Sequence, residues 1–164
     1  MTGSGSVTVP QAREQVFAML LDPVVLRQVI PGCHALDLVG TNSYRADVSL
    51  GAGPVRGRFD ANVRLCELDP PHFAKLEGRV IGSLGTAGGT GHIRLFDVPE
   101  GTRADYDYEI AISGKVASIG GRMLEGAARA VIGLFFRQLV AASGGQPNPT
   151  WRDWLINKVW RPPL

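Results

Sequence analysis

The feature that most limits the fold of this sequence is a long stretch without proline near its C-terminus, residues 115–143. Its apolar residues recur every three or four positions, and this spacing predicts a single amphipathic helix. The residues that we expect on its buried side are Val116, Ile119, Met123, Ala127, Val131 and Leu134. Ser113-Gly114 precedes the stretch, and Gly144-Gly145 follows it as a C-terminal stop.

Two features of this helix leave alternatives open. Small residues thin its buried side in the middle, which fits either close packing on a sheet or a cavity: Gly120, Gly121, Ala127 and Ala128. Ile132, Phe136 and Val140 form a second stripe, which we place on the outward side. That stripe is either a set of scattered surface residues or a contact with a partner or a membrane.

The chain before this helix changes its hydrophobic period from 3.6 to 2. We expect a strand at 4–9, short helices at 11–21 and 23–30, and strands at 35–39, 44–50, 55–68, 73–83, 91–98 and 103–113. Short turns between successive strands indicate an antiparallel sheet with one wet face. The sequence therefore predicts an α+β fold, in which a curved antiparallel sheet of about seven strands wraps around the C-terminal helix. We interpret the glycines between 82 and 91 as a bent hairpin, because no lysine follows in the frame of a phosphate loop.

Alternation along the strands predicts which residues face the helix and line a pocket. From the sheet these are Tyr44, Val48, Leu50, Phe59, Val63, Tyr106, Tyr108 and Ile110, and from the helix Met123, Ala127 and Val131. Such a lining is apolar with a few hydroxyl groups, which suits a flat hydrophobic ligand with one or two carbonyl groups. The alternative is an ordinary filled core.

Composition and spacing exclude several classes of protein. The net charge of +2 gives no reason to expect nucleic acid as a partner, and no run of about 20 apolar residues is present. Cys33 and Cys66 lack partners at C-x-x-C spacing, so we expect free thiols in the cytoplasm, and the first residues show no signal pattern. His34, His72 and His92 are far apart, so we expect no metal, no cofactor and no catalytic residues.

Several local strings occur in the order and spacing of a known family. They include Leu21-Asp22-Pro23, Ile30-Pro31-Gly32-Cys33, residues 51–59 (GAGPVRGRF), Leu68-Asp69-Pro70-Pro71 and Thr102-Arg103-Ala104-Asp105-Tyr106. Over about residues 3–142 the chain resembles the carbon monoxide dehydrogenase G subunit (CoxG) family of the START-like, or SRPBCC, helix-grip superfamily. The resemblance implies a non-enzymatic accessory protein that binds a lipid or quinone in its cavity. It also implies a molybdenum-containing dehydrogenase as partner and peripheral contact with the inner face of the cytoplasmic membrane.

The C-terminal residues 144–164 are predicted to be a linker and a tryptophan-rich tail beyond a domain of residues 1–143. Longer members of the family carry a hydrophobic anchor there, whereas this tail is too short to span a membrane. We expect Trp151, Trp154, Leu155 and Trp160 to contact a membrane or a partner, with packing of the tail on its own domain as the alternative. Two other functions stay open, namely a small-molecule enzyme of the cyclase type and a structural docking protein with a filled core.

Overall fold

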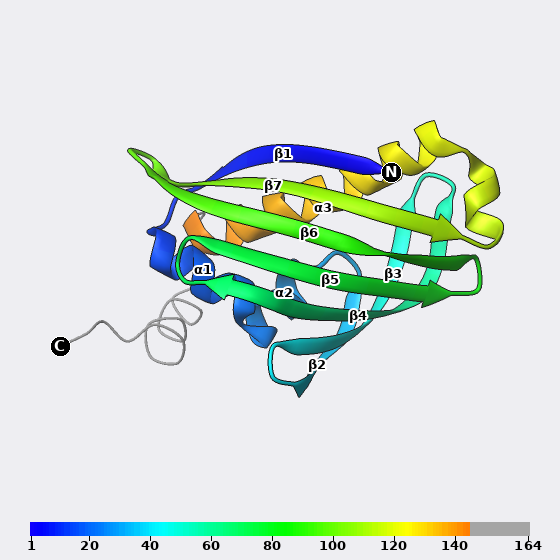
Figure 1. Cartoon of the computed structure of the whole chain (residues 1–164), viewed down its shortest axis with the longest axis horizontal. Helices are drawn as coiled ribbons and strands as arrows, with labels where there is room; N and C mark the ends of the chain where they lie inside the picture. Colours follow the sequence, from blue (N-terminus) through cyan, green and yellow to red (C-terminus); the bar gives the residue numbers. More distant parts are fainter. Residues whose placement is uncertain (145–164) are drawn as a thin grey trace.

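The computed structural model describes residues 1–144, which form one curved antiparallel sheet with helices on its concave side (Figure 1). The strands pair in the order β1-β7-β6-β5-β4-β3-β2, so β1 and β2 form the two edges. The fold is the predicted one. The elements are β1 (Thr2–Val9), α1 (Arg13–Leu21), α2 (Pro23–Val29), β2 (Cys33–Gly40), β3 (Ser43–Ala52), β4 (Val55–Asp69), β5 (Phe73–Gly82), β6 (Gly85–Val98), β7 (Gly101–Ser113), the 3-10 helix η1 (Lys115–Ile119) and α3 (Gly121–Gly144).

The main core lies where α1, α2 and the C-terminal half of α3 meet the concave face. Met19, Val29 and Leu139 are fully buried there, one from each helix. Helix α2 begins at Pro23, and the carboxylate of Asp22 caps it by accepting a hydrogen bond from the backbone N–H of Val24 at 2.8 Å. A smaller second cluster on β3 and β4 contains Ala46, Val48 and Phe59.

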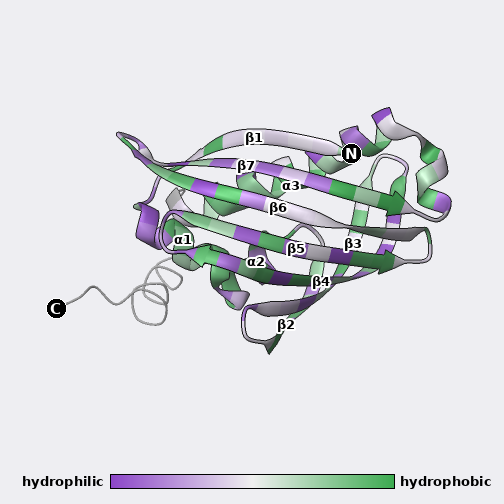
Figure 2. Cartoon of the chain, viewed as in Figure 1, coloured by the Kyte–Doolittle hydropathy of each residue, from purple (hydrophilic) through white to green (hydrophobic). Residues whose placement is uncertain are grey.

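Strand β6 is longer than the sequence predicted. It begins at Gly85 rather than near residue 91, so the glycine-rich run is part of the sheet. Figure 2 shows this first half of β6 paler than its neighbours, because glycine and threonine are neither strongly apolar nor charged. Pairing with β5 on one side and β7 on the other holds these residues extended despite their low strand preference.

The long helix begins later than predicted. Residues Lys115–Ile119 form a 3-10 turn, and α3 starts at Gly121. Between them Gly120 has a φ of +101°, which a right-handed helix cannot contain and which glycine adopts readily. The break lets the chain change direction before α3 returns toward α2 (Figure 1).

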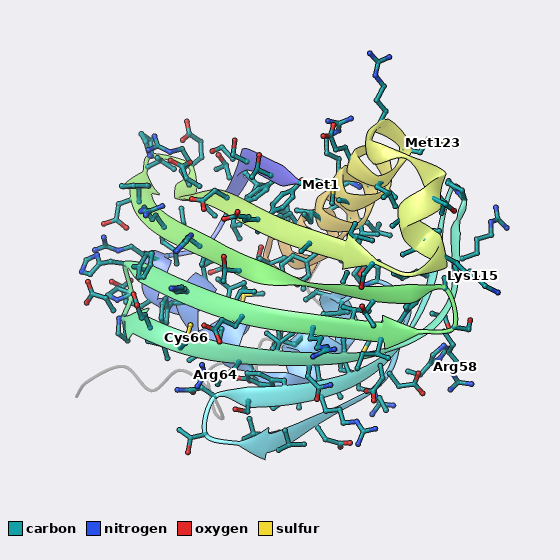
Figure 3. All side chains as sticks on the ribbon, turned by 45° about the vertical axis from the view of Figure 1, so that its right-hand side comes forward. Met1, Arg58, Arg64, Cys66, Lys115 and Met123 are labelled. Carbon is teal, nitrogen blue, oxygen red and sulfur yellow. The ribbon has the colours of Figure 1, made fainter. Side chains whose placement is uncertain are left out.

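The buried side of α3 is also different from the predicted one. Phe136 is 7% exposed and packs in the main core with Ile132 and Val140, the stripe that the sequence spacing places outward. Met123 is 54% exposed and lies on the turn of α3 that projects past the sheet (Figure 3). The aromatic residues of the C-terminal half decide the rotation, because burying a large ring outweighs the alignment of the smaller residues before it.

Within residues 1–144, no helix is long and apolar enough to cross a membrane. The predicted linker and tryptophan-rich tail, with Trp151, Trp154, Leu155 and Trp160, lie outside the described residues. The prediction that this tail contacts a membrane or a partner therefore stays a prediction.

Candidate functional site on the concave face

Three neighbouring rows of residues cross β4, β5, β6 and β7 on the concave face. Each row joins four residues that are direct partners in the antiparallel register. The rows are Leu65, Leu76, Gly91 and Tyr108; Val63, Gly78, Gly89 and Ile110; and Ala61, Val80, Ala87 and Ile112. None of these residues is charged, so this part of the sheet presents an apolar surface interrupted by positions without side chains.

The middle row, which we call the floor row, consists of Val63, Gly78, Gly89 and Ile110. Gly78 and Gly89 lack side chains, and their neighbours Val63 and Ile110 are half-buried, so part of each side chain stays exposed. Three strand spacings separate the outer two residues, so about 14 Å of the concave face carries no side chain between them. A Cβ at Gly78 would meet its nearest atoms at 3.8 Å, whereas a Cβ at Gly89 would overlap the carbonyl oxygen of Glu109.

Tyr106 and Tyr108 lean away from the floor row toward the edge strand β1. They are register partners of Gly5 and Gly3, and a Cβ at either glycine would overlap the tyrosine hydroxyl beside it. The two rings therefore cover the glycines of β1 and leave the surface over β5 and β6 free. Tyr106 is held there by a stacked contact with Phe136, with ring centroids 4.7 Å apart.

Helix α3 does not pack closely in its N-terminal half. A Cβ added at Gly121 or Gly126 would find no atom within 4 Å. Of the small residues that we expected on the thin side of this helix, Gly120 and Gly121 have open space where a Cβ would be, so close packing on the sheet is wrong at these two positions. Open space beside the helix and half-buried residues in the floor row are both features of a loosely packed concave face.

The predicted lining residues of the sheet lie in three places. Val63 and Ile110 end the floor row, and Tyr108 follows in the adjoining row with its ring leaning toward β1, as does the ring of Tyr106. Tyr44 belongs instead to the main core, where its hydroxyl donates to the carbonyl of Leu21 and is not free for a ligand. Burial raises the pKa of Tyr44, and the charge of Asp22 raises it further. The remaining predicted residues, Val48, Leu50 and Phe59, belong to or border the second cluster.

The predicted lining residues of the helix differ in exposure, because Met123 is exposed whereas Ala127 and Val131 are half-buried. Met123 is exposed, and Ala127 and Val131 follow it at helical spacing on the same side of α3. The residues of α3 that enter the main core are instead Phe136 and Leu139.

The sequence did not single out Gly78, Gly89 and Gly91 as site residues. We interpreted the glycines between 82 and 91 as a bent hairpin. Their signal is the period of two between Gly89 and Gly91, which places both on one face of a strand. That Gly89 lies opposite Gly78 depends on the register between β5 and β6, which the sequence does not show.

Titratable side chains gather on the convex face. The Nδ1 of His92 lies 2.8 Å from a carboxylate oxygen of Asp107, and Arg94 lies 3.3 Å from the other oxygen. The hydrogen bond with His92 is the main cause that lowers the pKa of Asp107, and Arg94 adds to it. Within residues 1–144, no three His, Cys, Asp or Glu side chains are placed to hold a metal ion.

A model of the carbon monoxide dehydrogenase G subunit (CoxG) family matches residues 5–143. The chain belongs to this family. A solved structure of a conserved protein from Geobacillus kaustophilus is 35% identical to this CoxG family member, with a TM-score of 0.82 over 85% of this chain and 93% of that one. No curated protein matches the chain.

Other solved structures share the fold at low identity. A START superfamily protein from Mycobacterium smegmatis is 13% identical with a TM-score of 0.68, over 87% of this chain and 96% of that one. A protein from Chromobacterium violaceum is 17% identical with a TM-score of 0.66, over 87% and 96% of the two chains. The START-like helix-grip fold predicted from the sequence is therefore confirmed for this CoxG family member.

Proposed function

We propose that this CoxG family member is a non-enzymatic accessory protein that binds a flat hydrophobic ligand, a quinone or a lipid, on its concave face. Membership of the CoxG family and the START-like fold support an accessory, ligand-binding role in general. The observation that carries the finer proposal is the floor row, where Gly78 and Gly89 leave a side-chain-free strip between Val63 and Ile110.

The chemistry of this surface favours a ring over a charged ligand. A planar ring lies against backbone without meeting side chains, and it gains free energy from leaving water in proportion to its apolar area. The hydroxyl of Tyr108 is the only side-chain donor in the three rows, and it lies beside Gly3 of β1, so a carbonyl group on the ring would have to point toward β1 to meet it. With no charged residue in the three rows, an anionic or cationic ligand would lose its hydration without compensation.

A cyclase-type enzyme is the second candidate, and the position of His92 counts against it. A histidine beside a carboxylate is the pair that acid–base chemistry would need. His92 and Asp107 form such a pair, but by register they face the convex side, away from the floor row. The concave rows contain no histidine, aspartate or glutamate, so they lack a group that could take up or release a proton.

The partner in this proposal is a molybdenum-containing dehydrogenase of the carbon monoxide dehydrogenase type, in keeping with the name of the family. A protein that holds a quinone or lipid next to such an enzyme would link it to the membrane in which these ligands dissolve. Membrane contact is assigned to the predicted tail, through Trp151, Trp154 and Trp160. Deleting residues 151–164 should abolish binding to liposomes while the domain stays folded, and unchanged liposome binding would refute this assignment.

The ligand proposal is tested by one substitution on each side of the sheet. Gly78→Leu places a side chain over the floor row, where the backbone leaves room for a Cβ. Gly88→Leu is the matched control, because Gly88 pairs with Arg79 on the convex face and also leaves room for a Cβ. Native mass spectrometry of protein purified without detergent should show a co-purifying or added quinone on the wild type and on Gly88→Leu but not on Gly78→Leu. A wild type that stays free of ligand after incubation with quinones, or equal binding by both variants, would refute the proposal.

A further inference from the structure

An open groove of about 770 Å³ separates β1 from the C-terminal half of α3. Strand β1 is an edge of the sheet in the described chain, so this groove lies along the side of the domain rather than under the sheet. Its volume falls within the range of small-molecule sites in proteins, which is about 300–1,000 Å³. None of the residues assigned to the floor row lines it.

The lining of this β1–α3 groove is mostly apolar. Val7 contributes from β1 and Val140 from α3, with the rings of Tyr106 and Phe136 between them. Among the described residues, the only charged side chain in the lining is Arg137, which is exposed at the surface. A groove of this kind can remove hydrocarbon from water, but it offers little to a highly charged ligand.

The groove has unfilled space at one defined point on α3. Gly133 lines it, and a Cβ at this position would meet no atom within 4 Å. Most helix positions that face a neighbouring strand carry a side chain that fills such space. Here the missing side chain leaves room for a chain of methylene or isoprenoid groups to pass between the helix and the strand.

Tyr106 is the residue that connects the groove with the surroundings of the candidate site. This residue lines the groove, and it lies two positions before Tyr108 on the same face of β7. Both rings lean over the glycines of β1, so they lie between the floor row, on β4 to β7, and the groove beside β1. A ligand with a ring on the floor row would have its substituent directed past these two rings.

We propose that the β1–α3 groove holds the hydrocarbon chain of an amphiphilic ligand whose ring lies on the floor row. This inference rests on the function proposed above and specifies its ligand class as a ring with a long apolar chain. It predicts that affinity rises with chain length by up to about fourfold for each methylene group that the groove removes from water.

The test uses one benzoquinone ring in three forms, without a chain and with a pentyl or a decyl chain. Equilibrium dialysis measures the dissociation constant of each form with the wild type and with Gly133→Leu, whose side chain would fill the groove. Gly126→Leu is the matched control, because Gly126 lies two turns earlier on the same side of α3, also has no atom within 4 Å of a Cβ, and does not line the groove. Leucine has a higher helix propensity than glycine, so neither change should unfold the helix.

The expected result is that the decyl form binds the wild type and Gly126→Leu much more tightly than the chainless ring. With Gly133→Leu the decyl form should bind only as tightly as the chainless ring, whose own affinity should not change. Equal affinities of the decyl form for the wild type and Gly133→Leu would overturn the inference, as would a wild type that does not distinguish the three forms. If Gly133→Leu no longer binds the chainless ring, the groove holds the ring rather than the chain, and the inference is overturned.

Failure of the proposed function and self-association of the chain would each give a distinct result. A wild type that binds none of the three quinones would refute the proposed function itself rather than the position of the chain. If Gly133→Leu binds the decyl form like the wild type but loses self-association on a sizing column, the inference is overturned and the groove belongs to a contact between two copies of this chain.

Discussion

The rotation of α3 is the feature of this fold that stability measurements can test most directly. Phe136 is 7% exposed and stacks on Tyr106, whereas Met123 on the same helix is 54% exposed. Replacing Phe136 by alanine removes a buried ring, the aromatic pair and the packing around them, for which we expect a loss of about 3–5 kcal/mol in the free energy of unfolding. Met123→Ala should change the free energy of unfolding by no more than about 0.5 kcal/mol.

The assay is equilibrium unfolding in urea followed by far-ultraviolet circular dichroism. Tryptophan emission is unsuitable, because all three tryptophans lie at positions 151–160, outside the described domain. A loss of about 3–5 kcal/mol corresponds to a fall in Tm of about 6–20 °C for a domain of this size. Phe136→Leu keeps most of the apolar volume and should lose less, which keeps the comparison measurable if the alanine variant is poorly folded.

A larger loss in the free energy of unfolding for Met123→Ala than for Phe136→Ala would refute the rotation of α3 described above. If Met123→Ala costs about 2 kcal/mol or more and Phe136→Ala less than about 1 kcal/mol, α3 is rotated as the heptad-like spacing of its N-terminal half predicts. In that case Met123, Ala127 and Val131 would face the sheet. The groove beside Gly133 would then not exist in the form described.

Two more perturbations test the tyrosines and the buried carboxylate. Gly5→Val should displace the ring of Tyr106 and lower the free energy of unfolding by about 1–3 kcal/mol. Ser4→Val, on the convex side of β1, is the control and should leave the free energy of unfolding nearly unchanged. Equal effects of the two substitutions would contradict the contact between this ring and β1. Burial raises the pKa of Asp22 above its usual 3.8, against the hydrogen bonds from α2 that lower it. The free energy of unfolding of the wild type, relative to that of Asp22→Asn, should therefore be greatest below pH 3.8 and fall as pH rises through the raised pKa. Urea unfolding across a pH series measures this difference. A difference that rises with pH would mean that the hydrogen bonds of the helix cap outweigh the effect of burial.

Local patterns in the sequence were sufficient for the order of the elements. Alternation identified the concave faces of β3, β4 and β7, because each of these strands has a run of apolar residues at every second position. Asp22-Pro23 marked the junction of α1 and α2 for a local reason, since the aspartate caps the helix that the proline begins. These signals need no knowledge of what lies across the sheet.

The candidate site depends on pairs that are far apart in the sequence, and here local patterns fail. Tyr108 leans toward β1 because its partner there is Gly3, more than one hundred residues earlier in the chain. Gly78 becomes part of a side-chain-free strip only because Gly89 lies beside it in the register of β5 and β6. A single strand gives no information about its partner's side chain, so the tyrosines were recognised while the space beside them was not.

The division of α3 into two halves connects the stability of the fold with its open surface. The C-terminal half carries Phe136 and Leu139 and packs into the main core, which fixes the rotation of the whole helix. At that rotation, a Cβ added at Gly121 or Gly126 in the N-terminal half would meet no atom within 4 Å. A helix with leucines at these glycines would gain helix propensity, and its side chains would meet no atom that they displace. The packing of α3 on the domain therefore depends on its aromatic C-terminal half, while the glycines of the other half leave open space around the helix.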